Sequence, residues 1–340
     1  MGKENNYLLE TIQNSVIIIF MRNYIIFDLE WNQSSKGKTG RVEHLPFEII
    51  EIGAVKLDET FRSHSEFHRL IRPQVYTTMH SVISEVTHMS MEELQETGEA
   101  FDVVIRDFLD WCGSDYIFCT WGSMDLMELQ RNMSYYNVEV PWELPLFYYD
   151  VQKLYSLIHG DGKQKSALDV AVEELHIESD RPFHRALDDA YYTGKVMETM
   201  GLELVKEYIS VDYYNLPVLE TEEIHLAFPD YTKYVSRLFS NREAMMKDRK
   251  VTELRCVLCG RSLRKKIRWF TPNQKIYYAL GLCPEHGLVK GKIRVKKSED
   301  GDAFVIKTTK LTDQNGEADI RTRKESVKKR REQKKKLSQN

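Results

Sequence analysis

The sequence predicts an α/β fold, in which a mixed β-sheet flanked by helices precedes a small basic module rich in turns. Three strand-like segments come first, and strands then alternate with amphipathic helices, a pattern typical of a mixed sheet. Charge is the third observation: residues 241–340 hold 28 Lys and Arg against 12 Asp and Glu, whereas residues 1–240 hold 20 against 40. An acidic body joined to a basic C-terminal part indicates a polyanionic partner.

The composition excludes several classes of protein. With 42% hydrophobic and 29% charged residues, the 340-residue chain is neither disordered nor collagen-like. Its five cysteines are too few for a disulfide framework and favour a reducing, cytoplasmic location. The apolar run at residues 16–21 (VIIIFM) is shorter than the ~20 residues of a membrane span and lacks the flanks of a signal peptide. We therefore expect a soluble protein with no membrane partner.

Three strands open the first domain. Residues 24–30 (YIIFDLE) are an apolar run that ends in acids, residues 48–57 alternate in polarity, and residues 65–71 do so more weakly. The spacing of apolar residues then predicts a helix over 91–111, an inner strand over 116–120, and helices over 123–136, 167–175 and 184–200.

Composition also predicts the domain boundaries. An irregular apolar pattern indicates a helical linker after the first domain. The lack of large apolar residues near the C-terminus predicts a tail that is disordered or transiently helical. The expected segments are an N-terminal extension over 1–20, a first domain over 21–210, a linker over 211–250, a basic module over 251–310 and a basic tail over 311–340. Whether Met21 is the true start is left open.

Acidic residues recur at the ends of the predicted elements. Asp28 and Glu30 stand at i and i+2 on a strand, so both side chains point to one face, where they repel each other unless a cation lies between them. Asp125 opens a helix, where it also suits the helix dipole. His184 precedes the helix that carries Asp189, and taken alone it is an ordinary surface histidine.

Three segments follow one another in the order FDLEWN (27–32), WGSMD (121–125) and HRALDDA (184–190). Together they resemble the motifs of the DEDD exonuclease superfamily, also called RNase T/DnaQ-like, in its histidine-containing DEDDh subclass. The middle motif is most similar to that of the KapD-like and histone-mRNA 3′-end exonuclease branch. The resemblance covers about residues 22–200 and implies a ribonuclease H-like, mixed five-stranded sheet flanked by helices.

The resemblance also implies an activity. Such enzymes remove nucleoside 5′-monophosphates from the 3′ end of single-stranded nucleic acid by two-metal hydrolysis, and the branch implies that RNA is preferred over DNA. A DNA repair or proofreading exonuclease and a catalytically silent nucleic-acid-binding protein remain alternatives. The implied ligands of two Mg²⁺ or Mn²⁺ ions are Asp28, Glu30, Asp125 and Asp189, with His184 as general base and Asp188 left solvated.

Three further residues are candidates for contacting the terminal nucleotide. Leu29 and Trp31 adjoin the first motif, and Trp31 has a ring that suits base stacking. Met89 stands where similar enzymes place an apolar wedge. A plain core role is the open alternative for Trp31 and Met89.

Two short cysteine motifs indicate zinc. Cys256-Val-Leu-Cys259-Gly and Cys283-Pro-Glu-His286-Gly each place two ligands around one side of a tetrahedral ion. All four positions are filled, so the sequence predicts one structural Zn²⁺ in a zinc-ribbon-like module; two unrelated surface pairs are the alternative. Cys112 and Cys119 flank an apolar strand and are expected to be core thiols.

Basic and aromatic residues are interleaved around these motifs. A surface of this kind neutralises phosphates and stacks bases, so we expect the module to bind nucleic acid or a ribonucleoprotein. The alternative is that the aromatic residues form the module's core. The residues concerned are Arg261, Arg264, Lys265, Lys266, Arg268, Trp269, Phe270, Tyr277, Tyr278, Lys292, Arg294, Lys296 and Lys297.

Overall fold

The protein is described from a computed structural model. The description covers residues 23–160, 162, 164–201, 208–228, 230–298 and 301–337, so the extension expected over residues 1–20 and Met21 lie outside it. The chain forms two compact units, Met1–Asn215 and Leu216–Asn340, which are taken in turn. Among the described residues, no helix combines the length and apolar character needed to cross a membrane.

The first unit is built on a mixed sheet in the order β3-β2-β1-β4-β5-β6. The central strand β1 pairs antiparallel with β2 and parallel with β4. The sheet has six strands rather than the expected five, because a two-residue strand pairs antiparallel with β5 at Tyr148 and Ser210. The strands are β1 (Asn23–Asn32), β2 (Glu48–Leu57), β3 (Ser63–Leu70), β4 (Tyr116–Thr120), β5 (Phe147–Asp150) and β6 (Ser210–Val211).

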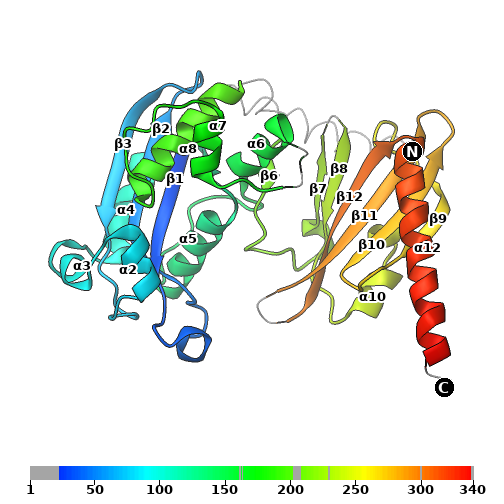
Figure 1. Ribbon diagram of the computed structural model, residues 1–340, viewed down its shortest axis with the longest axis horizontal. Helices are drawn as coiled ribbons and strands as arrows, with labels where there is room; N and C mark the ends of the chain where they lie inside the picture. Colours follow the sequence, from blue (N-terminus) through cyan, green and yellow to red (C-terminus); the bar gives the residue numbers. More distant parts are fainter. Residues whose placement is uncertain are drawn as a thin grey trace. The chain divides into compact units, whose positions relative to one another are not determined.

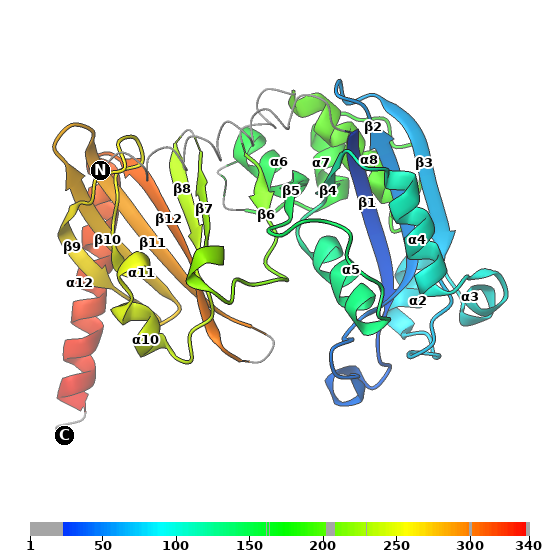
Figure 2. The same ribbon diagram turned by 180° about the vertical axis from the view of Figure 1, so that it is seen from behind.

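Helices cover both faces of this sheet. They are η2 (Gly37–Gly40), α2 (Ser81–Thr87), α3 (Met91–Thr97), α4 (Phe101–Cys112), α5 (Met124–Tyr135), α6 (Val151–His159), α7 (Leu168–Glu174) and α8 (Ala186–Met200). Tyr24 and Ile26 of β1 pack with α6, α7 and α8 (Figure 1), while Ile25 and Phe27 pack with α4 and α5 on the other face (Figure 2). Strand alternation therefore directs the even-numbered residues of β1 toward the face that α8 covers.

The helix expected over 91–111 is two helices, α3 and α4, which separate at Gly98. A side chain at this position would place its Cβ 2.4 Å from the Leu94 carbonyl oxygen and 2.7 Å from the backbone nitrogen of Arg72. The glycine thus lets the chain leave α3 and bring Glu99 into a bridge with Ile71. The apolar residues keep their helical spacing across this break, so the sequence pattern does not reveal it.

The second unit contains a six-stranded sheet in the order β7-β8-β12-β11-β10-β9, antiparallel throughout. Its strands are β7 (Ile224–Ala227), β8 (Tyr231–Val235), β9 (Arg264–Phe270), β10 (Ile276–Cys283), β11 (Gly287–Lys297) and β12 (Ala303–Thr312). Its helices are η3 (Glu220–Glu222), α10 (Arg242–Lys247), α11 (Arg249–Thr252) and α12 (Gln314–Leu337).

This arrangement differs from the expected linker and tail. Residues 211–250 contain β7, β8 and the end of β6 besides α10. The sequence pattern does not reveal these strands, because strands of two to five residues are too short to show a clear period. The expected disordered tail contains the 24-residue helix α12. Ile320 and Val327, seven residues apart, are both buried, and Ile320 packs on Ile267 and Leu280 of the sheet. Two apolar residues thus fix a helix whose composition alone indicates disorder.

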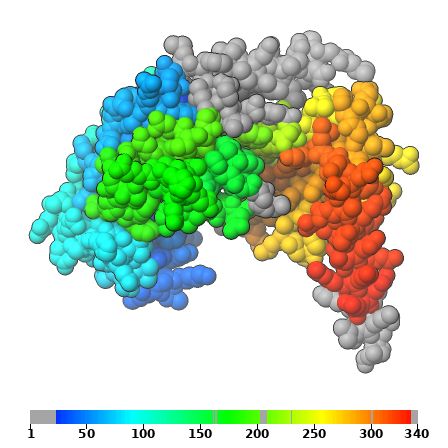
Figure 3. Space-filling view, turned by 45° about the horizontal axis from the view of Figure 1, so that its top comes forward, coloured from blue at the N-terminus to red at the C-terminus, as the bar shows by residue number. Residues whose placement is uncertain are grey.

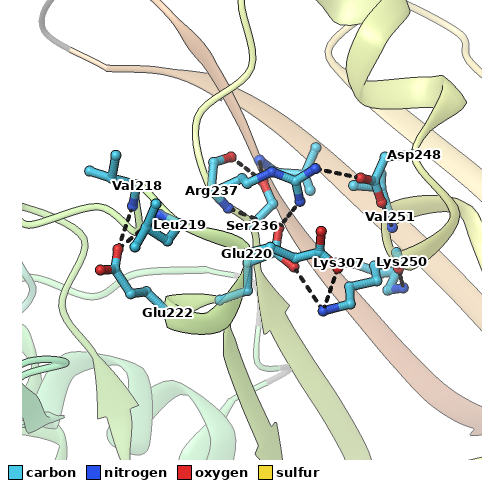
Figure 4. Close-up of polar contacts among 12 residues, drawn as sticks. Val218, Leu219, Glu220, Glu222, Ser236, Arg237, Asp248, Lys250, Val251 and Lys307 are labelled. Atoms are coloured by element: carbon cyan, nitrogen blue, oxygen red, sulfur yellow. Dashed lines mark hydrogen bonds and ion pairs between the residues drawn. The ribbon is translucent and has the colours of Figure 1, made fainter.

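A buried ionic network ties the segment before the zinc motifs to this sheet. The Glu223 side chain is fully buried, and its Oε1 accepts a hydrogen bond of 2.6 Å from Arg237 Nη1. Figure 4 shows the other end of Arg237 reaching Asp248, at 2.9 Å. Asp248 also accepts from the Val251 backbone N–H at the start of α11. Because a buried carboxylate is costly without a partner, Arg237 links this segment firmly to the unit.

Candidate active site and cysteine–histidine site

The structure brings together three of the four predicted carboxylates. Asp28 and Glu30 lie on β1 and Asp189 lies in the first turn of α8, and carboxylate oxygens of the three residues are all within 4.8 Å of one another. Asp28 and Glu30 have the same parity as Tyr24 and Ile26, so they point toward α8 as expected. The site is therefore the carboxyl end of one buried strand facing the beginning of one helix.

Asp125 lies beside this cluster. It is the second residue of α5 and is 5% exposed. Its negative charge contributes to raising the pKa of Asp28, and hydrogen bonds from its own backbone N–H and that of Leu29 hold its carboxylate. The four acidic residues thus form one electrostatic unit built from three elements of the fold.

Burial and mutual repulsion raise the pKa values of these acids. Burial is the largest cause in each case. The pKa of Asp28 rises well above its ordinary value, with Asp125, Glu30 and Asp189 adding to the effect. The pKa of Glu30 rises to about 8, and those of Asp125 and Asp189 rise to about 7. Without a cation, the folded protein holds these side chains at an energetic disadvantage near neutral pH.

Two observations show that the residues fit divalent ions. Asp189 Oδ1 is buried and has no hydrogen-bond partner among the described residues, while its Oδ2 accepts from the backbone N–H of His184 at 3.2 Å. The donors that converge here are carboxylate oxygens, which suit Mg²⁺ and Mn²⁺. Divalent metal ions would be held by this cluster.

His184 lies next to the carboxylate cluster, where its backbone N–H donates to Asp189. It precedes α8 with φ of +66°, a left-handed backbone conformation that is uncommon outside glycine. The residue is exposed, and its side chain makes no hydrogen bond within the part of the chain that is described. The neighbouring Asp188 is partly buried and lies 3.6 Å from Arg181, so it is ion-paired instead of left fully solvated as expected.

Sequence reasoning missed the residues that hold α8 in place. Glu51 of β2 is fully buried and accepts hydrogen bonds from His68 Nε2 at 2.6 Å and Arg185 Nη2 at 2.9 Å. Although burial acts to raise the pKa of Glu51, these hydrogen bonds and the Arg185 charge lower it. Its Oε2 also accepts from the backbone N–H of Ala186, the first residue of α8. The signal in the sequence is an acid placed between isoleucines within a strand.

Gly53 completes this contact between strand and helix. A Cβ at this position would lie 2.0 Å from the backbone nitrogen of Leu187 and 2.2 Å from the carbonyl carbon of Ala186. Only glycine therefore lets the first turn of α8 lie directly against β2. This close approach sets Asp189 opposite the end of β1.

The three residues predicted to contact the terminal nucleotide differ in how deeply they are buried. Leu29 is 3% exposed, and Met89 is 1% exposed and packs with Ile50 and Leu94. Trp31 is half-buried, with its ring centroid 5.7 Å from that of Phe47. Leu29 on β1 and Met89 in the loop after α2 are thus buried, which is the core role left open above for Met89. Contact of these residues with the terminal nucleotide stays a prediction.

Residues 25–197, half of the chain, match the family model of the RNase T exonucleases. The chain belongs to this exonuclease family. No curated protein matches the sequence closely enough to name a relative.

Solved structures similar to this exonuclease share little sequence with it. A full-length 3′-exonuclease is 19% identical, with a TM-score of 0.48 over 59% of this chain and 94% of that one. The nuclease domain of 3′hExo, a DEDDh family member bound to rAMP, is 19% identical, with a TM-score of 0.48 over 57% and 98%. An E. coli ExoI–ssDNA complex is 14% identical, with a TM-score of 0.42 over 52% and 40%.

The four predicted zinc ligands converge in the second unit. Sγ of Cys259 lies 3.8 Å from Sγ of Cys283, and Nδ1 of His286 lies 3.6 Å from Sγ of both Cys256 and Cys283. A tetrahedral ion with Zn–S bonds of about 2.3 Å and a Zn–N bond of about 2.0–2.1 Å requires edges of roughly 3.8 and 3.6 Å. The atoms are therefore spaced as ligands of one tetrahedral ion.

The local backbone supports this arrangement. Gly260 and Gly287, which follow the two motifs, have φ of +68° and +81°, which other residues rarely adopt. Burial acts to raise the pKa of Cys283, but backbone N–H groups of Glu285 and His286 donate to its sulfur and the pKa falls to about 6. A thiolate is thus available to a metal at neutral pH. In contrast, Cys112 and Cys119 are buried core thiols, as expected, and burial raises the pKa of each.

The aromatic residues near this site belong to the core. Tyr277 and Tyr278 are each 7% exposed, and the Trp269 ring donates its Nε1–H to the carbonyl of Thr252. The expectation that these rings stack on bases is therefore wrong for the two tyrosines, because both faces of the sheet are covered at β10. Tyr277 packs with residues of α10 and α11, and Arg323 of α12 lies over the ring of Tyr278. The exposed basic residues are left as the part that can contact phosphates.

Without divalent ions, the free energy of unfolding should fall as the pH rises from about 4 to 8. Unfolded Asp and Glu titrate near pH 4, whereas the folded pKa values of Asp189 and Glu30 are about 7 and 8. The folded state therefore binds more protons across this range, and stability decreases as they leave. Thermal unfolding followed by circular dichroism, with Zn²⁺ present and Mg²⁺ and Mn²⁺ omitted, measures the effect.

Asp28→Asn removes one buried charge, so at pH 8 it should unfold at a higher temperature than the wild type, by roughly 2–4 °C for each kcal/mol gained. Asp107→Asn makes the same change on the exposed face of α4 and should leave the unfolding temperature unchanged. A wild-type unfolding temperature that stays level from pH 5 to 8 would contradict this account of the site.

Cys259→Ser should lose the metal of the second unit and lower its stability by several kcal/mol, because a structural zinc contributes directly to folding. We expect one Zn²⁺ per wild-type chain by atomic emission and much less in the variant, together with a lower unfolding temperature. Leu258→Ser, at a residue that is 57% exposed in the same motif, should keep both. Equal zinc content in all three proteins would exclude this ligand set.

Proposed function

We propose that this exonuclease removes nucleoside 5′-monophosphates from the 3′ end of single-stranded nucleic acid, with RNA preferred over DNA. The observation that carries the proposal is the convergence of Asp28, Glu30 and Asp189 beside a buried Asp125 and an exposed His184. The preference for RNA is supported by the resemblance of the middle motif, residues 121–125, to the histone-mRNA 3′-end exonuclease branch.

The four carboxylates would hold two Mg²⁺ or Mn²⁺ ions. When bound, such ions supply charge stabilisation to a phosphodiester under attack and to the oxygen that leaves. Asp189 contributes the unpartnered Oδ1, and Glu30 and Asp28 contribute the oxygens of the strand. Removal of any of these carboxylates lowers the negative charge that attracts the ions.

His184 accepts the proton of the attacking water on an imidazole nitrogen. Its exposed side chain is free to meet a substrate, and its backbone N–H fixes it to Asp189 at 3.2 Å. In this step the water oxygen bonds to phosphorus and the water proton moves to the imidazole. The bond from phosphorus to the 3′-oxygen breaks, and that oxygen keeps the electron pair and takes a proton from solvent to become the new 3′-hydroxyl. Glu51 and Arg185 contribute by holding α8 in position and do not touch the substrate.

The cysteine–histidine site serves a structural purpose in this proposal. All four ligand positions around the ion would be occupied by Cys256, Cys259, Cys283 and His286, so none is open to a substrate. Zinc would fix the turn between β10 and β11 to the chain that precedes β9. The ion thereby stabilises the edge of a sheet that carries exposed basic residues.

Digestion of 5′-labelled single-stranded RNA and DNA of one sequence tests the activity. With Mn²⁺, the wild type should produce a ladder that shortens from the 3′ end, faster on RNA, and no ladder should form when Mn²⁺ is left out. Asp189→Asn should reduce the rate by about a thousandfold or more, and His184→Ala by about 10²–10⁴-fold.

Matched variants give this experiment its controls. His176 is exposed and has φ of +54°, so His176→Ala copies the local conditions of His184→Ala and should keep the wild-type rate. Asp188→Asn neutralises the neighbour of Asp189 and should change the rate much less. A wild type that digests neither strand with Mn²⁺, or an Asp189→Asn variant of undiminished rate, would overturn the proposal.

A further inference from the structure

Helix α12 presents a basic surface that the fold itself does not neutralise. Of its 24 residues, ten are Lys or Arg and four are Asp or Glu. The acids Glu317 and Asp319 are engaged near the sheet, where they pair with Lys266, Lys290, Arg321 and Arg323. Further along the helix, exposed basic residues have no acidic partner among the described residues: Lys324, Lys329, Arg330 and Arg331.

Two apolar residues of α12 are buried and are not available on its surface. Ile320 is fully buried and Val327 is 8% exposed, and between them the Arg323 guanidinium lies 5.3 Å from the centre of the Tyr278 ring. Figure 3 shows α12, in red, at the surface of the second unit. A helix that binds a membrane surface needs an exposed apolar face. The described residues of α12 offer none, so its solvent-facing side suits a polyanion in water.

Strand β11 adds basic residues on the same face of the sheet as α12. Leu288 packs in the cluster that contains Ile320, and Lys290, Lys292 and Arg294 follow it at intervals of two residues. Lys292 is partly buried, and burial, followed by the charges of Arg294, Lys290 and Arg323, lowers its pKa. Positive charges are thus gathered closely enough on this face to repel one another.

We propose that the exposed basic residues of α12, together with Lys292 and Arg294 of β11, bind the phosphate backbone of single-stranded nucleic acid without regard to its base sequence. Tyr278, the tyrosine on this face, is buried and its ring is covered by Arg323, so it is not free to stack on a base. Contacts of basic side chains with phosphates position a strand but carry no sequence information. This inference rests on the proposed function in one respect, because it takes the bound strand to be the substrate of the nuclease.

Two variants, each of which loses three positive charges, test whether this basic surface binds nucleic acid. Lys329, Arg330 and Arg331 are changed together to Gln, which keeps the helix propensity, and the control changes Arg242, Lys247 and Arg249 of α10 and α11 to Gln. The control residues belong to helices that pack with Tyr277 and Ile293, on the opposite face of the same sheet. Fluorescence anisotropy with 30-nucleotide RNAs of two unrelated sequences, in an Asp189→Asn background without added Mg²⁺ or Mn²⁺, gives the dissociation constant at several salt concentrations.

The α12 variant should bind both RNAs roughly tenfold or more weakly at low salt. Its slope of log K against log salt should be smaller by about 2, since each phosphate contact on a single strand contributes about 0.7. The control variant should retain the affinity and slope of the parent. With the catalytic residues intact, the α12 variant should hydrolyse a trinucleotide at the unchanged rate.

Several results would overturn this inference. They are wild-type affinity and salt slope in the α12 variant, an equal loss in both variants, and a loss confined to one of the two RNA sequences. Binding to anionic vesicles but not to RNA would also overturn it, in favour of a membrane surface. Failure of the intact enzyme to hydrolyse the trinucleotide would instead count against the proposed function, because that substrate is too short to require α12.

Discussion

The mutual repulsion of four acidic side chains is the constraint on which the first unit depends. Asp28, Glu30, Asp125 and Asp189 are brought together in a partly buried place where each raises the energy of the others. Such a cluster is costly to fold unless cations compensate it, and it persists because the surrounding packing gives the acids no alternative position. Its high negative charge is also what would attract divalent ions.

The second feature of the site is a rigid frame that carries no reacting group. Glu51 joins β2 to the start of α8 through Arg185 and Ala186, and Gly53 lets the two elements touch. Because Arg185 lies between His184 and Asp189 in the sequence, this anchor positions both residues at once. An ion pair in which the carboxylate is fully buried and the guanidinium partly exposed contributes less to stability than to holding one arrangement.

Much of this site is predictable from the sequence: the strand period places Asp28 and Glu30 on one face, and the resemblance to the DEDDh motifs adds Asp125 and Asp189. The Cys and His spacing likewise predicts one cluster. What the sequence does not reveal depends on contacts between distant segments. The anchor Glu51, the burial of Met89 and the helical state of α12 are set by partners up to 135 residues away along the chain, and the short strands β7 and β8 have no period to detect.

The central claim is that the carboxylate cluster holds divalent ions. Isothermal titration of Mn²⁺ into protein that retains its zinc, in the presence of a non-hydrolysable single-stranded oligonucleotide, tests it most directly. The account predicts two Mn²⁺ ions per wild-type chain and at most one in Asp28→Asn, with Asp107→Asn matching the wild type. No Mn²⁺ binding to the wild type, or the same two ions in Asp28→Asn, would contradict it.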